Sequence, residues 1–367
     1  MLRRIYIDNF RCLVNFELRL DRIALLLGPN GSGKSSLLDA LWGVQEFVLE
    51  GARVEDAFPP SSLTRWQTLD AQRFELEFED GEDRYCYRLT VEHDLPRRKV
   101  RVREERLDLG DKPLFQFAAG MVQLYRDDHS PGPQFPFDWG RSGVGMLHER
   151  PDNERLARFR TILKRLVIVR PLPPLMEQES RGHASRLGMR MENFASWFRH
   201  ISQEHMGSVM ELMGLLREAL PGFDTLSLKE AGEEVRLLKA QFRDPATGKP
   251  ASYGFGELSD GQRMLIALYA LVYGIKEEGA ALCIDEPDNF VALAEIQPWL
   301  SQLMDACGEW LGQAILVSHH PEIINYLGAS HGRWFSREAQ GPVRVTETPA
   351  DDYPGITLAE MVARGWA

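Results

Sequence analysis

Cysteine is scarce in this sequence, and its four cysteines form no recognisable pattern. They stand at positions 12, 86, 283 and 307, so there is no Cys-x-x-Cys pair, and neither a zinc site nor a disulfide framework is predicted. Long apolar runs are also missing, which predicts that no helix crosses a membrane. The first ten residues contain Arg3 and Arg4 but no apolar block after them, so a secretory signal is not expected and the cytoplasm is the expected compartment.

Positive charge is in deficit, because the formal net charge of the 367 residues is −11. Residues 97–190 are the exception: they hold 19 Lys and Arg against 12 Asp and Glu. Internal repeats are absent, and no heptad pattern persists, so a long coiled coil is not predicted. The hydrophobic content of 44% and the charged content of 26% are those of an ordinary globular protein with an acidic body and a basic middle segment.

A glycine-rich stretch follows the continuous apolar run Ile23–Leu27, which is typical of a strand buried on both faces. The stretch Gly28–Ser35 (GPNGSGKS) fits the phosphate-loop pattern G-x-x-x-x-G-K-[ST], and a helix is predicted to begin at about Lys34. Glycines let backbone N–H groups converge on a phosphate, and the helix N-terminus adds a positive field. Lys34 is expected to reach the β- and γ-phosphates of ATP, and Ser35 to hold Mg²⁺. The other predicted nucleotide contacts in this loop are Asn30, Gly31, Gly33 and Ser36.

Two carboxylates end another predicted buried strand, in the stretch ALCIDEP from Ala281 to Pro287. Asp285 is placed to bind the Mg²⁺ shell, and Glu286 is the natural general base for the attacking water. The alternative is an acidic loop that only caps a core strand. The phosphate loop elsewhere in the chain favours the catalytic interpretation.

Two further motifs suit a nucleotide site. The stretch Leu258–Gln262 (LSDGQ) opens a predicted helix, and Ser259 with Gln262 fits a capping box. A helix N-terminus with a glycine near its start is also an anion site, and this one is predicted to serve a nucleotide held by another subunit. The stretch Ser318–Ile323 (SHHPEI) follows a predicted strand at Ala314–Val317, where a histidine can sense or stabilise a γ-phosphate.

The order of these four motifs resembles that of the ABC ATPase superfamily, and most of all its soluble branch that includes SMC, RecF and the OLD-family ATPases of bacteria. The opening IDNFRCL (Ile7–Leu13) and the stretch GFGELSDGQRMLIAL (Gly254–Leu268) are similar to that branch as well. The resemblance covers about residues 1–50 and 190–330 and is weak between them. It implies an ATPase head of which two copies sandwich two ATP·Mg²⁺.

The resemblance also implies roles for individual residues. Ser259 and Gly261 correspond to signature residues that touch the γ-phosphate across a dimer interface. His319, in preference to His320, corresponds to the switch histidine. Arg11 matches an arginine that contacts nucleotide phosphate, and the loop at Asn289 would cross the dimer axis.

Some parts of the family pattern are not found. Gln72 and Gln123 are the candidates for the Q-loop glutamine, and neither has a distinctive context. The long coiled coil and zinc hook of SMC-like relatives are absent. No acidic DxD cluster follows His319, so the nuclease domain fused to OLD proteins is not expected and DNA cutting would need a partner chain.

A basic stripe is predicted in Leu95–Leu107 (LPRRKVRVREERL), where alternate residues of a strand are cationic. A row of like charges is a good surface for nucleic-acid phosphates, and such contact would be largely sequence-blind. A solvated edge strand protected by charge and contact with an acidic partner protein are the alternatives. The four cations of the stripe are Arg97, Lys99, Arg101 and Arg103.

The predicted fold is an α/β P-loop NTPase, an ABC ATPase head with a β-rich insertion and a helical subdomain. Proline and glycine in Ser130–Pro136 predict a loop. The predicted segments are an N-terminal ATPase part with the phosphate loop (1–60), the β-rich insertion (61–150), the helical subdomain (151–255), the part with the signature, DEP motif and switch histidine (256–335), and a C-terminal extension (336–367).

The predicted function is ATP binding and hydrolysis by a homodimer that closes around ATP. Hydrolysis would be coupled to a DNA-associated process, such as phage defence or genome maintenance, with an effector protein such as a nuclease. The alternatives are an ATP-dependent scaffold or sensor with little turnover, and the ATP-binding subunit of a membrane transporter. Glu286 argues against the scaffold, and the IDNFR opening and the β-rich insertion argue against the transporter.

Overall fold

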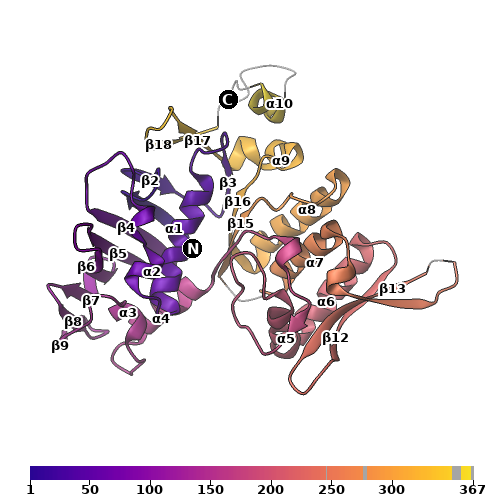
Figure 1. Ribbon diagram of the computed structural model, residues 1–367, viewed down its shortest axis with the longest axis horizontal. Coiled ribbons are helices and arrows are strands. Elements are labelled where there is room, and N and C mark those ends of the chain that lie inside the picture. The colour runs from indigo at the N-terminus through magenta and orange to yellow at the C-terminus, as the bar shows by residue number, and fades with distance from the viewer. Residues whose placement is uncertain (245, 276–278, 349–356, 365–367) are drawn as a thin grey trace. The chain divides into compact units, whose positions relative to one another are not determined.

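The computed structural model describes residues 1–244, 246–275, 279–348 and 357–364 of the chain (Figure 1). The chain divides into two compact units. The first unit is Met1–Leu166 with His331–Pro349, and the second is Val167–Ser330 with Ala350–Ala367. Part of the predicted C-terminal extension, at 349–356 and 365–367, lies outside the described residues. Among the described residues, no helix combines the length and apolarity that crossing a bilayer requires.

The first unit is built on an antiparallel sheet of eight strands in the order β2-β1-β4-β5-β6-β7-β8-β9 (Figure 1). In β4 the side chains of Phe74, Leu76 and Phe78 are buried, and the glutamates between them point to the other face, as the alternating sequence predicts. The strands are β1 (Leu2–Asp8), β2 (Phe16–Arg19), β4 (Ala71–Asp80), β5 (Asp83–Asp94), β6 (Lys99–Leu109), β7 (Lys112–Ala118), β8 (Met121–Tyr125) and β9 (Pro131–Pro136).

Helices pack on the apolar face of this sheet. Phe159 of α4 packs against Tyr87 of β5 with the ring centroids 5.5 Å apart, and Phe58, at the end of α2, lies 4.6 Å from Phe74. The same face therefore holds the core of the first unit. Its helices are α1 (Lys34–Leu49), α2 (Val54–Ala57), the 3₁₀ turn η1 (Pro60–Ser62), α3 (Gly143–Met146) and α4 (Glu154–Lys164).

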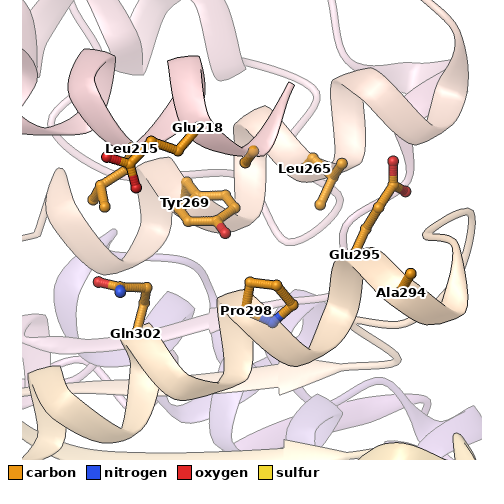
Figure 2. A pocket seen from close by; sticks show the side chains of 9 residues that line it. Leu215, Glu218, Leu265, Tyr269, Ala294, Glu295, Pro298 and Gln302 are labelled. Atoms are coloured by element: carbon orange, nitrogen blue, oxygen red, sulfur yellow. The ribbon is translucent and has the colours of Figure 1, made fainter. Parts of the chain in front are cut away.

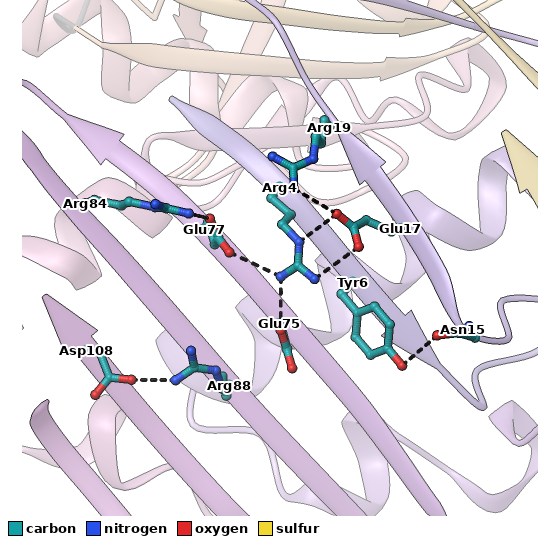
Figure 3. Close-up of polar contacts among 10 residues, drawn as sticks. All are labelled: Arg4, Tyr6, Asn15, Glu17, Arg19, Glu75, Glu77, Arg84, Arg88 and Asp108. Carbon is teal, nitrogen blue, oxygen red and sulfur yellow. Dashed lines mark hydrogen bonds and ion pairs between the residues drawn. The ribbon is translucent and has the colours of Figure 1, made fainter. Parts of the chain in front are cut away.

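The other face of the sheet carries ion pairs (Figure 3). Arg4 of β1 bonds Glu17 of β2 and Glu75 of β4, both at 3.0 Å. Arg88 of β5 pairs with Asp108 of β6 at 2.6 Å. Charges of both signs on alternate residues keep this face in water and leave the apolar face to the helices.

The continuous apolar strand predicted before the phosphate loop is β3 (Ile23–Leu27), and all five of its residues are buried. In the first unit β3 pairs in parallel with β17 (Gly332–Arg337), which pairs antiparallel with β18 (Val343–Glu347). The carboxyl end of β3 leads into the glycine-rich stretch, and α1 begins at Lys34 as predicted.

The loop predicted at Ser130–Pro136 is wrong, because Pro131–Pro136 forms β9. This strand is the last of the sheet and pairs only with β8 among the described strands. An edge strand tolerates proline because its outer backbone positions need no N–H donor.

The second unit contains parallel strands with helices packed beside them. Strand β15 (Ala280–Asp285) is wholly buried and pairs in parallel with β16 (Leu311–Val317), and β10 (Leu166–Val169) is its other neighbour. Helix α6 packs on α7, α7 on α8, and α8 on β16. The helices of this unit are α5 (Phe194–Glu204), α6 (Met206–Ala219), α7 (Asp260–Tyr273), α8 (Leu293–Glu309), α9 (Pro321–His331) and α10 (Leu358–Ala363), with the 3₁₀ turns η2 (Pro173–Leu175) and η3 (Phe255–Glu257).

A small antiparallel sheet in the second unit was not expected from the helical pattern of residues 151–255. Its two long strands, β12 and β13, pair antiparallel, with Phe223 opposite Phe242 at one end and Glu230 opposite Arg236 at the other. The buried residues Phe223 and Leu226 are three apart, a spacing more typical of a helix, which conceals the strand in the sequence. The strands are β11 (Glu179–Ser180), β12 (Phe223–Glu230), β13 (Arg236–Arg243) and β14 (Pro250–Gly254). The predicted segment boundaries stay a prediction.

Candidate nucleotide site

Glycine is required twice in the predicted phosphate loop of the first unit. Gly28 has φ of 137°, and a Cβ there would lie 2.1 Å from the carbonyl oxygen of Phe335. Gly33 has φ of 102°, and its Cβ would lie 2.7 Å from Cγ2 of Val343. Both conformations are open to glycine and strained for other residues. Phe335 of β17 and Val343 of β18 therefore leave no room for a side chain at these two positions.

Lys34 folds back over this loop. Its side chain is buried, and Nζ donates to the carbonyl oxygens of Gly28 at 2.7 Å and Pro29 at 3.1 Å. Gly33 is the N-cap of the 16-residue α1 and offers no side-chain acceptor to the first N–H groups of that helix. An ammonium group and a helix N-terminus without a side-chain cap are a combination that binds phosphate.

The other predicted residues of the loop lie at its surface and at the first turn of α1. Asn30 and Gly31 are exposed, and Ser35 and Ser36 are half-buried. The thiol of Cys12 donates a hydrogen bond to the hydroxyl oxygen of Ser36, with Sγ and Oγ 3.8 Å apart. The hydroxyl of Ser36 is thus already engaged with the segment before β2.

Arg11 lies beside α1 in the same unit. Its guanidinium forms an ion pair with Asp39, one helical turn beyond Ser35. Its backbone N–H donates to the carbonyl of Ser62 at 2.7 Å, and its φ is 51°. The exposed arginine is consequently held near the first turns of the phosphate-loop helix.

The two Q-loop candidates serve the fold. Gln72 is completely buried: its amide donates to the carbonyl of Asn9 at 3.0 Å, and its oxygen lies 2.9 Å from Nε2 of His93. Gln123 of β8 donates to the carbonyl of Gly132 at 3.0 Å. Since both amides bond within the sheet, neither presents itself to a nucleotide.

Asp285 ends β15 in the second unit and is 1% exposed. Its Oδ2 accepts a hydrogen bond from Nε of Arg170 at 2.7 Å. Its Oδ1 is buried and has no hydrogen-bond partner among the described residues. A buried carboxylate oxygen without a donor is costly unless a cation or water takes it, so this oxygen fits the predicted Mg²⁺ shell.

Arg170 is the functional candidate that sequence reasoning missed. It follows directly after β10, the neighbour of β15, and so arrives at the same sheet edge as Asp285. The signal in the sequence was a basic residue between the apolar run VIV and a proline. Only the pairing of β10 beside β15 gives that residue a partner.

Glu286 is held in a left-handed turn, with φ of 53°. Its backbone N–H donates to the carbonyl of Val317 at 2.8 Å, and its carboxylate accepts from Nδ2 of Asn289 at 2.6 Å. The backbone is thus fixed by β16, and the carboxylate is oriented by the loop that follows it.

Ser259 is the N-cap of α7, as the capping box predicts. Its Oγ accepts from the N–H of Gln262 at 3.3 Å, and its own N–H donates to Oε1 of Gln262 at 3.1 Å. A Cβ on Gly261 would lie 2.8 Å from the carbonyl oxygen of Phe290. The signature motif and the loop after Glu286 therefore touch within one unit, a contact that the sequence did not reveal.

The two histidines after β16 differ in environment. Nδ1 of His320 accepts from the N–H of Glu322 at 3.2 Å and so caps α9, whereas His319 is exposed. The hydroxyl of Ser318 donates to Asp288 at 2.6 Å, which ties this strand end to the loop after Glu286. His320 has a structural task, and this supports the choice of His319 as the switch residue.

The predicted residues thus gather in two sets. The first unit holds Arg11, the phosphate loop, Lys34, Ser35 and Ser36. The second unit holds Ser259, Gly261, Asp285, Glu286 and His319.

The four cations of the basic stripe are all exposed, on and just before β6. Two of them already have carboxylate partners, Arg101 with Glu92 at 2.7 Å and Arg97 with Asp94 at 3.4 Å. The guanidinium of Arg101 also lies 5.0 Å from the ring centroid of Trp139. An aromatic side chain distant in sequence therefore joins the stripe.

Solved structures of SMC head domains are similar to this chain. The head domain with an extended coiled coil bound to the C-terminal domain of ScpA, from Pyrococcus furiosus, aligns over 94% of this chain and 96% of that chain, with a TM-score of 0.51 and 14% identity. The head domain from Thermotoga maritima aligns over 95% of this chain and 99% of that chain, with a TM-score of 0.47 and 14% identity. The first likeness confirms the predicted fold class, that of a P-loop ATPase head.

Two family models match separate segments of the chain, and each segment contains some of the predicted nucleotide-site residues. Residues 1–58 match the family described as "AAA ATPase domain", and residues 253–325 match the family described as "AAA domain, putative AbiEii toxin, Type IV TA system". A protein named OLD nuclease from Thermus scotoductus is 29% identical over 96 residues, which are 26% of this chain and 15% of that relative. The chain thus matches a small part of that relative's length. The predicted resemblance is thus confirmed over these segments, which are similar to AAA ATPase domains and to part of an OLD nuclease.

Proposed function

We propose that this chain binds and hydrolyses ATP, dimerises around it, and couples hydrolysis to a DNA-associated process through a partner effector. The observation that carries the proposal is the loop Gly28–Gly33, held left-handed at the end of a buried strand with the ammonium of Lys34 folded over it. Lys34 would exchange its carbonyl partners for the β- and γ-phosphates, and Ser35 would turn its hydroxyl toward the metal. Asn30, Gly31, Gly33, Ser36 and Arg11 would contact the phosphates.

The residues of the second unit supply the hydrolytic chemistry in this proposal. When bound, Mg²⁺ neutralises charge on the β- and γ-phosphates, and the donor-free oxygen of Asp285 suits its shell. Glu286, oriented by Asn289, takes a proton from the attacking water. His319 stands at the adjacent strand end as a donor to the γ-phosphate.

Dimerisation is proposed because the exposed Ser259 begins a 14-residue helix whose dipole favours an anion. Ser259 and Gly261 would seal a nucleotide held by the second copy. The DNA-associated role is proposed from the basic stripe and from what the matched proteins are called, an OLD nuclease and a toxin family. Phage defence or genome maintenance, with a nuclease as effector, fits those names.

Steady-state phosphate release and sedimentation velocity test the ATPase proposal together. Glu286→Gln should lower turnover by roughly 10²- to 10⁴-fold, the usual contribution of a general base, and should accumulate a dimer in ATP·Mg²⁺. Ser259→Ala should prevent that dimer, and Thr357→Ala, which removes the matching cap of α10, should not. Equal turnover of wild type and Glu286→Gln, or a monomer under every nucleotide condition, would refute the proposal.

Electrophoretic shift on double-stranded DNA tests the basic stripe. A variant with Arg97, Lys99, Arg101 and Arg103 changed to glutamate should lose sequence-independent binding and most of its salt dependence. Unchanged affinity with ATP present would remove DNA contact from the proposed function and leave the ATPase part intact.

A further inference from the structure

The two oxygens of the Asp285 carboxylate have different surroundings. Nε of Arg170, which belongs to the same unit, donates to Oδ2 at 2.7 Å. Oδ1 is buried and has no hydrogen-bond partner among the described residues. One oxygen of a buried carboxylate is therefore held by a cation, and the other is left open.

This one-sided contact differs from what an ion pair that only stabilises a fold is expected to show. A guanidinium presents parallel N–H groups that match both oxygens of a carboxylate, and such bidentate pairs are frequent. Because Asp285 is 1% exposed, a second bond to Oδ1 would remove the cost of a buried oxygen without a donor. The arginine instead fixes one oxygen and leaves the other for a ligand.

The carboxylates that follow in the chain have neutral donors. Oε2 of Glu286 accepts from the amide of Asn289 at 2.6 Å, and Oδ1 of Asp288 accepts from the hydroxyl of Ser318 at 2.6 Å. A donor that is itself charged strengthens the bond to a carboxylate. Asp285, which meets a guanidinium, is thus the carboxylate of this loop whose direction is fixed most firmly.

The backbone that carries Arg170 is held on two sides. The N–H of Arg170 donates to the carbonyl oxygen of Met189 at 2.6 Å, directly after strand β10. Three residues further on, the carbonyl oxygen of Pro173 accepts from Nη1 of Arg263 of α7 at 2.7 Å. An arginine on a fixed backbone can hold its partner in one direction, and the residue that supports a metal ligand has to do the same.

We propose that Arg170 is a positioning residue for the metal: it holds Oδ2 of Asp285, so that Oδ1 remains the oxygen available to Mg²⁺. This inference rests on the proposed function, in which Asp285 belongs to the shell of the metal that accompanies ATP. Hydrogen bonds to a metal-binding carboxylate orient it, and their loss typically weakens metal binding by roughly 10- to 100-fold. Arg170 acts only through Asp285 in this proposal.

Electron paramagnetic resonance of free Mn²⁺ tests the proposal, because Mn²⁺ suits the same oxygen ligands as Mg²⁺ and the measurement needs no turnover. With the full chain and a non-hydrolysable ATP analogue, Arg170→Met should raise the Kd for Mn²⁺ by roughly 10- to 100-fold. Arg170→Lys keeps a charged donor but not the planar fork, and should raise it by only roughly 2- to 10-fold. Binding of a fluorescent ATP analogue in EDTA should be unchanged in both variants, because Lys34 and the phosphate loop do not depend on Asp285.

The control variant lies elsewhere in the second unit. A pocket of about 280 Å³ between α6, α7 and α8 is lined by Glu218 and by none of the residues of the Asp285 contact (Figure 2). Glu218→Gln also changes the charge of the unit by one, and it should leave the Kd for Mn²⁺ as in wild type.

An unchanged or lower Kd for Mn²⁺ in Arg170→Met would overturn the proposal, and a lower one would identify Arg170 as a counter-ion that the metal displaces. Equal weakening of analogue binding in EDTA, or no recovery in Arg170→Lys, would reduce its role to the fold alone. If Arg170→Met does not fold, the difference between Mn²⁺ and EDTA conditions in Arg170→Lys decides. A wild type that binds no nucleotide would refute the proposed function and this inference together, whereas normal wild-type binding matched by Arg170→Met would overturn this inference alone.

Discussion

The variant Arg170→Met would break the ion pair with Asp285 but keep an aliphatic side chain of similar length. Asp285 would then hold a buried charge without its donor at 2.7 Å. Removing one partner of a fully buried pair costs roughly 3–5 kcal/mol. The side chain of Arg170 is 35% exposed, so solvent screens part of this interaction, and the expected loss is about 1–2 kcal/mol in the free energy of unfolding. Urea unfolding without nucleotide measures it.

The control is Arg181→Met, which breaks the exposed pair with Glu179 and should cost under about 0.5 kcal/mol. A double-mutant cycle with Asp285→Asn should give a coupling energy of about 1–2 kcal/mol, because the two residues share one interaction. If the losses of the two single variants simply add, the pair does not stabilise this sheet edge and the reasoning fails.

Three further predictions concern stability and the helix caps. Burial raises the pKa of Glu105 to about 7, so the folded state keeps a proton that the unfolded state releases, and stability should fall by up to about 3 kcal/mol as pH rises from about 4.5 to about 7. Burial lowers the pKa of His93 to about 4, so the contribution of His93 to stability rises with pH and opposes that of Glu105. The quantity to measure is therefore the difference in the free energy of urea unfolding between wild type and Glu105→Gln across that pH range. A difference that does not change with pH would contradict the prediction. Gly28→Ala should lower the stability measured by thermal unfolding by about 3 kcal/mol or more, because the added Cβ meets the carbonyl of Phe335. The control Gly81→Ala, which has positive φ but open space around it, should lower stability by only about 1 kcal/mol. Equal losses would exclude the steric explanation. Ser259→Ala should lower stability by about 1 kcal/mol through loss of its cap, and a calorimetric scan with no change would show that the cap contributes little.

The parts of the fold that depend on short stretches of sequence were predictable. A continuous apolar run followed by glycines and lysine gave β3, the loop and α1 with the first helical residue at Lys34. The alternating apolar residues of Phe74–Phe78 gave β4, and the Ser259 capping box gave the start of α7. In each case the signal lies within a few residues and reflects backbone geometry.

The missed features depend on which strands become neighbours. Arg170 acquires its partner 115 residues away only because β10 lies beside β15. The close approach of Gly261 to Phe290 likewise needs α7 and the loop after β15 to be packed together. The strand β9 was missed because proline argues against a strand unless the strand is known to lie at an edge. Local propensity contains none of this information.

The contact between Gly261 and Phe290 constrains how relatives of this chain can diverge. The contact involves the backbone carbonyl of residue 290, so the side chain at that position can change as long as the carbonyl keeps its direction. Phe290 has φ of 70°, so its natural replacements are asparagine or glycine, which tolerate that backbone. Relatives that keep this packing should therefore hold glycine at 261 invariant while the residue at 290 drifts within a narrow set.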